Sequence, residues 1–199
     1  MPEQSTRERI IDTAYDLFRE KGYDQTTIND ICAACGITKT TFYYHLDSKE
    51  NLISRYYKSV TQSLASQILD VLSQENYWEQ LVVCFQTIVE ASIKIGSDLD
   101  AQLFIMNLRK DKGTFDMNDD LTKMAVLLIT RAQKAGQIRN QSPPEQLYYA
   151  FSHAFIGYEL KWCIKKGSFD RKKHLRMAME NIFDVDPSLR SEWKEEYYY

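Results

Sequence analysis

The fold is decided by one stretch near the N-terminus, TTINDICAACGITKTTFYYHLDSKENL, residues 26–52. Its Thr27 precedes Asp30 by three positions, which is the spacing of a capping box, in which each side chain binds the free backbone N–H of the other residue. The box predicts a short helix over Ile28–Cys35. Gly36 follows directly and suits the left-handed turn that ends such a helix.

A second short helix begins almost at once, because Thr38 can cap the segment Lys39–His45. Two short helices joined by a turn of about three residues that contains a glycine indicate a helix-turn-helix. In that motif the second helix enters the major groove of DNA, where short polar side chains touch base edges. The pattern therefore predicts that residues 38–45 read DNA.

Helices are also expected on both sides of this motif. Ser5 and Glu8 repeat the capping-box spacing and start a helix over residues 5–21. After Leu46, a long amphipathic helix is expected from Asp47 to Ser73, linking this head to the rest of the chain. Its expected buried side consists of Leu52, Ile53, Tyr56, Val60, Leu64, Ile68 and Leu72.

The remainder of the chain is predicted to be a helical body. Only 7 Gly and 4 Pro occur in 199 residues, which suits long helices, and no convincing alternating strand appears. The fold class is therefore all-α, with a helix-turn-helix domain at 1–47, an effector-binding and dimerisation domain at 48–185 and a C-terminal tail at 186–199. Apolar periodicity places the body helices at Tyr77–Ile95, Asp98–Lys110, Asp119–Gly136, Pro144–Lys166 and Asp170–Asp184.

Charge and composition exclude several function classes. The formal net charge is −3, with 25 Lys and Arg against 28 Asp and Glu, so DNA contact has to be local rather than a general basic coat. No apolar run is long enough to span a bilayer and no secretory leader is apparent, so we expect a cytoplasmic protein that does not associate with membranes. No catalytic or phosphate-binding motif is found, so neither an enzyme nor a cofactor is expected.

Nine residues of the head are candidates for DNA contact. Lys39, Thr40 and Thr41 offer donors and a methyl group to base edges, whereas Tyr43 and His45 can hold the backbone. Two further donors lie at helix N-termini, where the helix dipole favours a phosphate. An ordinary three-helix corner with solvated polar faces is the alternative. The full set is Thr27, Asn29, Lys39, Thr40, Thr41, Tyr43, Tyr44, His45 and Lys49.

This head resembles the DNA-binding domain of the TetR family over about residues 5–55, without gaps. The resemblance rests on Thr26–Ile31, on Cys35–Leu46 and on Ser48–Leu52. It implies phosphate contacts at Thr27, Tyr43, His45 and Lys49, base-reading roles at Lys39, Thr40 and Thr41, and a weaker role for Asn29. Departures are small: Leu46 stands where the family most often has Phe, and Cys32 and Cys35 stand where it usually has small residues.

Beyond residue 55 the resemblance is one of architecture. It implies a helical body whose last two long helices, 144–166 and 170–184, form a four-helix interface with a second copy. A homodimer with two heads about 34 to 36 Å apart would bind a palindromic double-stranded operator. The resemblance favours a repressor that a small-molecule effector of unknown identity releases.

The effector would need a cavity in the body lined by apolar and aromatic side chains. The candidates are Phe85, Phe104, Met106, Met124, Leu128, His153, Tyr158 and Trp162, and plain core packing is the alternative for each. Two other functions stay open. The body could dock a protein partner in the manner of a coactivator, or the chain could be a small-molecule binder whose head has lost its affinity for DNA.

Two further features of the sequence resemble functional sites but are better explained by ordinary protein structure. Cys32 and Cys35 have the spacing of redox and zinc sites, but no second pair follows, so we expect buried thiols and no metal. The basic run between Lys161 and Arg176 straddles the end of one expected helix and the start of the next. A solvated rim explains it better than a second nucleic-acid surface.

Overall fold

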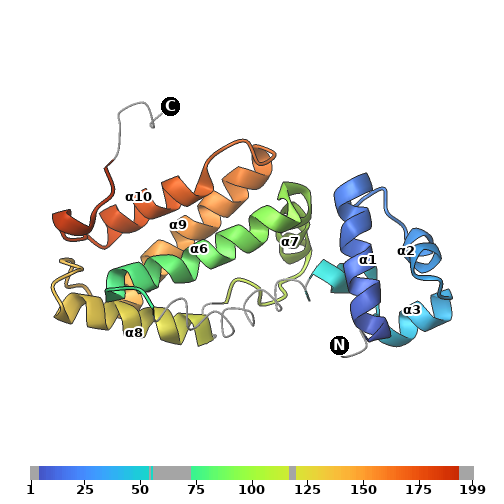
Figure 1. Ribbon diagram of the computed structural model, residues 1–199, viewed down its shortest axis with the longest axis horizontal. Helices are drawn as coiled ribbons and strands as arrows, with labels where there is room; N and C mark the ends of the chain where they lie inside the picture. Colours follow the sequence, from blue (N-terminus) through green and yellow to red (C-terminus); the bar gives the residue numbers. More distant parts are fainter. Residues whose placement is uncertain (1–4, 54, 56–72, 117–119, 193–199) are drawn as a thin grey trace.

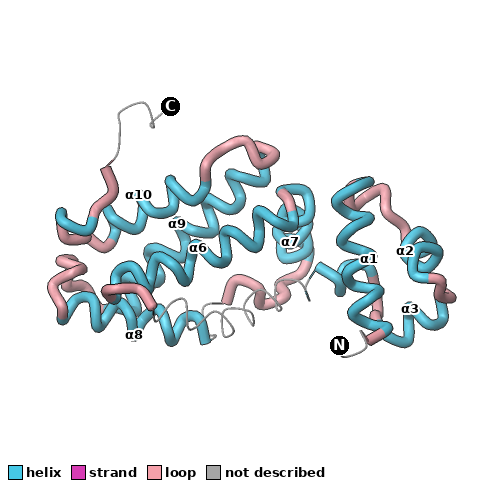
Figure 2. Tube along the Cα trace, in the orientation of Figure 1, coloured by secondary structure: helices cyan, strands magenta, loops and turns pink. Residues whose placement is uncertain are grey.

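The computed structural model describes residues 5–53, 55, 73–116 and 120–192. Over these ranges the chain is helical and its β-structure is limited to one isolated bridge between Ile138 and Val185. A small head of three short helices lies at one end of the molecule and a larger bundle lies at the other (Figure 1). The all-α class predicted from the sequence is confirmed, and short loops connect most of the helices (Figure 2).

The head comprises α1 (Thr6–Lys21), α2 (Ile28–Cys35) and α3 (Lys39–His45). The capping box that Ser5 and Glu8 were predicted to form is present at the start of α1, where the Glu8 carboxylate accepts from the Ser5 N–H at 3.0 Å. These bonds satisfy N–H groups that have no partner within the helix and so fix where α1 begins.

The turn between the second and third helices also follows the sequence prediction. Thr27 and Asp30 form the second capping box, and Gly36 ends α2 with φ of 64°, a left-handed conformation that a side chain would strain. The Thr38 hydroxyl accepts from the Thr41 N–H at 3.1 Å and starts α3. Phe42 is fully buried and holds α3 against the other two helices.

The body contains five helices in the described part of the chain, and each lies close to its predicted range. They are α6 (Tyr77–Ile95), α7 (Ser97–Arg109), α8 (Asp120–Lys134), α9 (Pro144–Ile164) and α10 (Arg171–Ile182). In Figure 1, α6, α9 and α10 lie side by side, and α8 flanks them at the end of the body away from the head.

Buried apolar residues form two separate clusters. One fills the body between α6, α8, α9 and α10 and includes Trp78, Phe85 and Phe151. The other joins the head to the body, because Ile95 and three residues of α7 pack with the head residues; we call it the junction core. It contains Ile10, Ala14, Phe18, Tyr23, Ile31, Cys32, Cys35, Phe42, Leu46, Leu52, Ile53, Ile95, Leu99, Leu103 and Met106.

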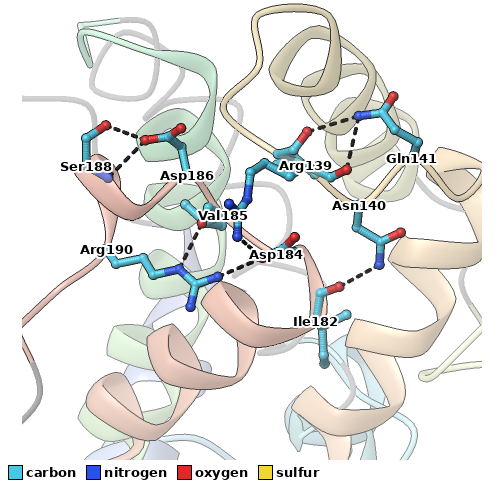
Figure 3. Close-up of polar contacts among 10 residues, drawn as sticks. Arg139, Asn140, Gln141, Ile182, Asp184, Val185, Asp186, Ser188 and Arg190 are labelled. Carbon is cyan, nitrogen blue, oxygen red and sulfur yellow. Dashed lines mark hydrogen bonds and ion pairs between the residues drawn. The ribbon is translucent and has the colours of Figure 1, made fainter.

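Polar contacts fasten the segment after α10 to the loop before α9 (Figure 3). Asp184 accepts from the guanidinium of Arg139 at 2.6 Å and from that of Arg190 at 2.8 Å. Residues Pro187–Leu189 form a 3-10 helix, η1. Asp186 caps its start, because its carboxylate accepts from the Ser188 N–H. The first residues of the expected tail therefore pack on the body.

Part of the predicted linking helix can be checked. Residues 49–53 are helical, and Leu52 and Ile53 are buried as expected. The other residues of its predicted buried side, Tyr56, Val60, Leu64, Ile68 and Leu72, lie outside the described residues. Among the described residues, no helix is both long enough and apolar enough to cross a membrane.

Candidate functional site

The exposed face of α3 carries the predicted DNA-contacting residues. Lys39, Thr40, Tyr43 and Tyr44 are exposed, and the Tyr44 side chain has 84% of its surface accessible. A tyrosine buries a large apolar ring in most positions, so two adjacent exposed tyrosines leave apolar surface uncovered. His45 is partly covered and its ring meets the edge of Tyr44, with 5.0 Å between ring centroids.

Polar groups at the starts of α2 and α3 are the remaining candidates on the head. Thr27 and Asn29 are exposed, and the Thr27 hydroxyl donates to the Asp30 carboxylate at 2.6 Å. This hydrogen bond lowers the pKa of Asp30 and keeps it ionised within the capping box. Thr41 is partly covered, and its hydroxyl lies 3.0 Å from that of Thr38.

Lys49 has a different environment from the other eight candidates. Its ammonium donates to the backbone carbonyls of Tyr23 at 2.7 Å and of Thr26 at 2.9 Å. It also lies 3.9 Å from the centre of the Tyr23 ring, close enough for a cation–π contact. Burial lowers the pKa of Lys49. The ammonium thus closes the loop between α1 and α2 rather than facing outward with α3.

We expect Lys49→Met to destabilise the head by about 1 to 3 kcal/mol, because two carbonyl groups lose a charged donor. The free energy of unfolding in urea measures this loss. The matched control is Lys39→Met, which changes an exposed lysine and should shift stability by less than about 0.5 kcal/mol. Equal stabilities of the two variants would show that Lys49 does not hold the loop.

A cavity of about 100 Å³ lies in the body between α6, α7, α8, α9 and the loop that follows α7. Five aromatic rings and several polar groups line it, and α9 contributes the largest share of its wall. The lining consists of Phe85, Ile88, Phe104, Thr114, Phe115, Asp116, Leu121, Thr122, Tyr148, Ser152, Phe155, Ile156 and Glu159.

The structure brings two of the eight predicted pocket residues, Phe85 and Phe104, to this cavity. Met106 belongs to the junction core, and Leu128 and Met124 pack in or against the body core. The other three lie elsewhere on α9: His153 is exposed, Tyr158 packs against the rings of Phe169 and His174, and Trp162 stacks on the Arg171 guanidinium.

The sequence analysis missed the α9 residues that do line the cavity. Tyr148, Ser152, Phe155 and Glu159 follow one another at intervals of three or four residues, which places them on one face of a helix. That periodicity was present in the sequence, and it would have separated them from His153, Tyr158 and Trp162. Selecting residues of α9 only because they are aromatic or histidine could not separate the two groups.

A buried charged cluster adjoins the cavity through Glu159. Arg171, the first residue of α10, pairs with Glu159 of α9 and lies 3.6 Å from the Asp100 carboxylate of α7. It also donates to the Val89 carbonyl of α6 at 3.2 Å. One guanidinium therefore ties four helices together, and all three charged side chains are almost completely buried.

The cluster strongly perturbs the ionisation of Glu159. Burial, together with the nearby charge of Asp100, raises the pKa of Glu159 to about 8, although Arg171 opposes this shift. The Cys163 thiol donates to Asp100 at 3.4 Å, and burial raises its pKa as well. Two carboxylates thus share one guanidinium, and Glu159 can hold a proton near neutral pH.

The cavity is connected to the head through α7. Phe104 lines the cavity and stacks on Phe115, with 5.0 Å between ring centroids, whereas the preceding residue, Leu103, lies in the junction core. Asn107 anchors the loop that carries Phe115, because its side chain donates to Thr114 and accepts from the Lys112 N–H. A change in the cavity wall therefore acts on a helix that also supports the head.

Comparison with known proteins gives a family match at the head. The model described as "Bacterial regulatory proteins, tetR family" matches residues 10–56. The biofilm operon icaADBC HTH-type negative transcriptional regulator IcaR of Staphylococcus aureus (strain Newman) is 39% identical over 71 residues, which are 36% of this chain and 38% of that protein. IcaR of Staphylococcus epidermidis is 50% identical over 54 residues, 27% of this chain and 28% of its own length.

Solved structures match over nearly the whole chain. FadR of Thermus thermophilus, a transcriptional repressor in complex with lauroyl-CoA, has a TM-score of 0.67 and 19% identity, and the match covers 95% of this chain and 97% of that one. FadR of Bacillus subtilis in complex with stearoyl-CoA has a TM-score of 0.56 and 15% identity, with 88% and 96% covered. These likenesses show a common fold of head and body.

Proposed function

We propose that this chain, whose head matches the model of the tetR family of bacterial regulatory proteins, is a member of that family of regulators rather than an enzyme, and that it is a sequence-specific DNA-binding repressor released by a small-molecule effector. The relatives that match the head include a negative transcriptional regulator, and structures of the same fold include a repressor bound to an acyl-CoA. The protein acts in the cytoplasm in this proposal, where it meets both DNA and metabolites.

The exposed face of α3 is the single observation that carries the proposal. It presents Lys39, Thr40, Tyr43 and Tyr44 to solvent on a short helix that Phe42 and the Thr38 cap hold rigidly. A rigid helix with a basic side chain, hydroxyls and exposed aromatic rings suits the major groove, where these groups contact bases and phosphates. Thr27, Asn29, Thr41 and His45 complete the proposed DNA surface, whereas Lys49 supports it from within.

We further propose that the active form is a homodimer built on α9 and α10. Tyr149, Leu160 and Ile164 leave 51%, 40% and 69% of their surface exposed, and their spacing places them with His153 on one side of α9. Exposed apolar side chains along one helix face favour association with another copy. Two heads related by a twofold axis would bind a palindrome with half-sites about one helical turn apart.

Effector binding in the body would shift the dimer between a DNA-binding arrangement and a released one. A tenfold decrease in DNA affinity requires the effector to favour the released arrangement by about 1.4 kcal/mol. The cavity wall at Phe104 and Phe115 acts on α7, whose other side packs in the junction core under the head. A cavity of about 100 Å³ lined by five aromatic rings favours a small molecule over a docked protein partner.

Salt-dependent DNA binding tests the proposal. We expect Lys39→Met to weaken binding to any duplex and to lower the slope of log affinity against log salt concentration by about one. Fluorescence anisotropy with a labelled duplex measures both quantities. The control is Lys165→Met, an exposed lysine beyond α9, which should leave the slope unchanged. A slope that falls for Lys165→Met but not for Lys39→Met would place the DNA surface on the body instead.

A further inference from the structure

The buried charged cluster lies directly beside the packing that supports the head. Arg171 of α10 pairs with Glu159 of α9 and lies 3.6 Å from the Asp100 carboxylate of α7. At most 3% of the surface of each of these three side chains is exposed. Asp100 follows Leu99 in α7, and Leu99 belongs to the junction core. One residue therefore separates the cluster from the core that joins head to body.

The two acids of the cluster contact each other. The Glu159 carboxyl group is hydrogen-bonded to the Asp100 carboxyl group and to the Ser92 hydroxyl of α6. A hydrogen bond between two carboxyl groups must contain a proton, because ionised carboxylates can only accept. That proton belongs to the pair rather than to either residue alone. The polar contact between α7 and α9 at this point therefore depends on it.

The surroundings of Glu159 determine when the proton leaves. Burial, followed by the charge of Asp100, raises the pKa of Glu159 to about 8, although the Arg171 guanidinium opposes this shift. The Cys163 thiol donates to Asp100 at 3.4 Å and stays protonated, because burial raises its pKa. The pair therefore loses its proton in mildly alkaline solution. The groups around Glu159 are Ser92 of α6, Asp100 of α7, Cys163 of its own helix, Arg171 of α10 and, along the cavity, Asp116 of the loop after α7 and Thr122 of α8.

We propose that Asp100, Glu159 and Arg171 form a proton-operated lock, which holds α7 to the body while the two acids share a proton and weakens when that proton is lost. Once both acids are ionised, two negative charges face each other in a buried site, and their repulsion pushes α7 away from α9. Leu99 and Leu103 of α7 pack with the head, which lies beside α7 in Figure 1. Rising pH therefore loosens the support of the head and lowers its affinity for DNA. The effect on DNA rests on the proposed function, whereas the lock itself does not.

Unfolding in urea between pH 6 and pH 9 tests the lock in the full-length protein, with Glu159→Gln compared at the same protein concentration. Glu159 binds a proton in the folded protein up to a pKa of about 8, but its ordinary pKa is 4.5. The folded state therefore loses stability as the pH rises through this interval. Relative to Glu159→Gln, the unfolding constant of the parent should rise about fivefold to tenfold between pH 6 and pH 7 and level off above about pH 8. Parallel pH profiles of the two proteins would overturn the proposal.

Two further variants assign the effect to the pair. Asp100→Asn removes the neighbouring charge, so Glu159 should ionise more readily and the levelling-off should move to lower pH by about one unit or more. It tests the pair from its other side, so it also decides the question if Glu159→Gln does not fold. The control is Glu90→Gln, a half-exposed acid paired with Lys172 on the surface, which should reproduce the parent profile. An unshifted profile in Asp100→Asn would contradict the lock.

Hydrogen exchange locates the loosening. At pH 8.5 the amides of α7 should exchange at least about threefold faster in the parent than in Glu159→Gln, because only the parent carries two charges at the cluster. Both proteins are compared at one pH, so the chemical rate of exchange is the same for both. The amides of α8 (Asp120–Lys134), which lies outside the cluster, provide the internal reference. A ratio for α8 as large as that for α7 would indicate a general loss of stability and refute a lock on α7.

DNA affinity separates the lock from the repressor function. The probe is a duplex that the parent protein selects from a random pool. Between pH 7 and pH 8.5 the affinity of the parent should fall at least about threefold relative to that of Glu159→Gln, since all other titratable groups are the same in both proteins. A constant ratio of the two affinities would overturn the link between lock and head. If neither protein binds any duplex at any pH, the repressor function fails, and the unfolding and exchange experiments still decide whether the lock exists.

Discussion

Replacement of Arg171 by Met is expected to destabilise the protein by about 3 to 5 kcal/mol, because it leaves Glu159 and Asp100 buried without their positive partner. The aliphatic part of Met can still fill the space beside Trp162, on which the guanidinium stacks. The loss should thus come from charge rather than from a large cavity. The free energy of unfolding in urea at pH 8 measures it.

The neighbouring pair provides a matched control. Lys172 binds Glu90 at 2.6 Å on the surface, where both side chains are about half exposed. Lys172→Met should therefore cost less than about 1 kcal/mol. The deficit of Arg171→Met should also shrink at acidic pH, because protonation of the two carboxyl groups removes the uncompensated charge. Similar losses in both variants, independent of pH, would show that the buried cluster does not hold the four helices together.

Truncation of Leu103 to Ala is expected to cost about 2 to 5 kcal/mol, because the side chain is fully buried in the junction core and the head cannot collapse freely onto α7. Since α7 also carries Phe104 in the cavity wall, this variant should weaken the effect of a bound ligand on DNA affinity as well. Unfolding in urea measures the loss of stability, and DNA titrations with and without a small molecule selected for binding to the purified protein measure the loss of coupling.

Leu108 on the same helix serves as the control. Its side chain is 85% exposed, so Leu108→Ala should change the free energy of unfolding by less than about 0.5 kcal/mol and leave the ligand response unchanged. If Leu103→Ala matched this control in stability, the junction core would not join head to body. If it destabilised the protein but left the ligand response intact, coupling would have to run through another part of the chain.

The head could be predicted closely from the sequence because local chemistry determines it. The capping boxes at Ser5 and Thr27 and the glycine at 36 act within a few residues of one another, so their spacing alone predicts where the helices begin and end. Lys49 shows the limit of such reasoning. The phosphate contact expected of it stays a prediction, and the structure adds that its ammonium donates to carbonyl groups more than twenty residues earlier in the chain, which local spacing could not reveal.

The cavity in the body was harder to predict because its walls come from distant segments. Phe85 and Phe104 lie on different helices from Phe155, and Phe115 and Asp116 lie on a loop that had no predicted role. The buried cluster is likewise invisible to local patterns. Asp100, Glu159 and Arg171 each look like ordinary surface charges of helices, and only the packing of α7, α9 and α10 brings them together.

Selection of duplex DNA from a random pool by the purified protein tests the central claim most directly. We predict that a palindromic sequence is enriched, with half-sites about 10 base pairs apart, and that Tyr43→Ala loses most of this binding while Leu127→Ala, on α8 of the body, keeps it. Tyr43 and Leu127 are similarly exposed, at 51% and 49%, so the comparison isolates their positions on the head and on the body. Enrichment of no sequence, or an equal loss in both variants, would contradict the account of this protein as a helix-turn-helix regulator.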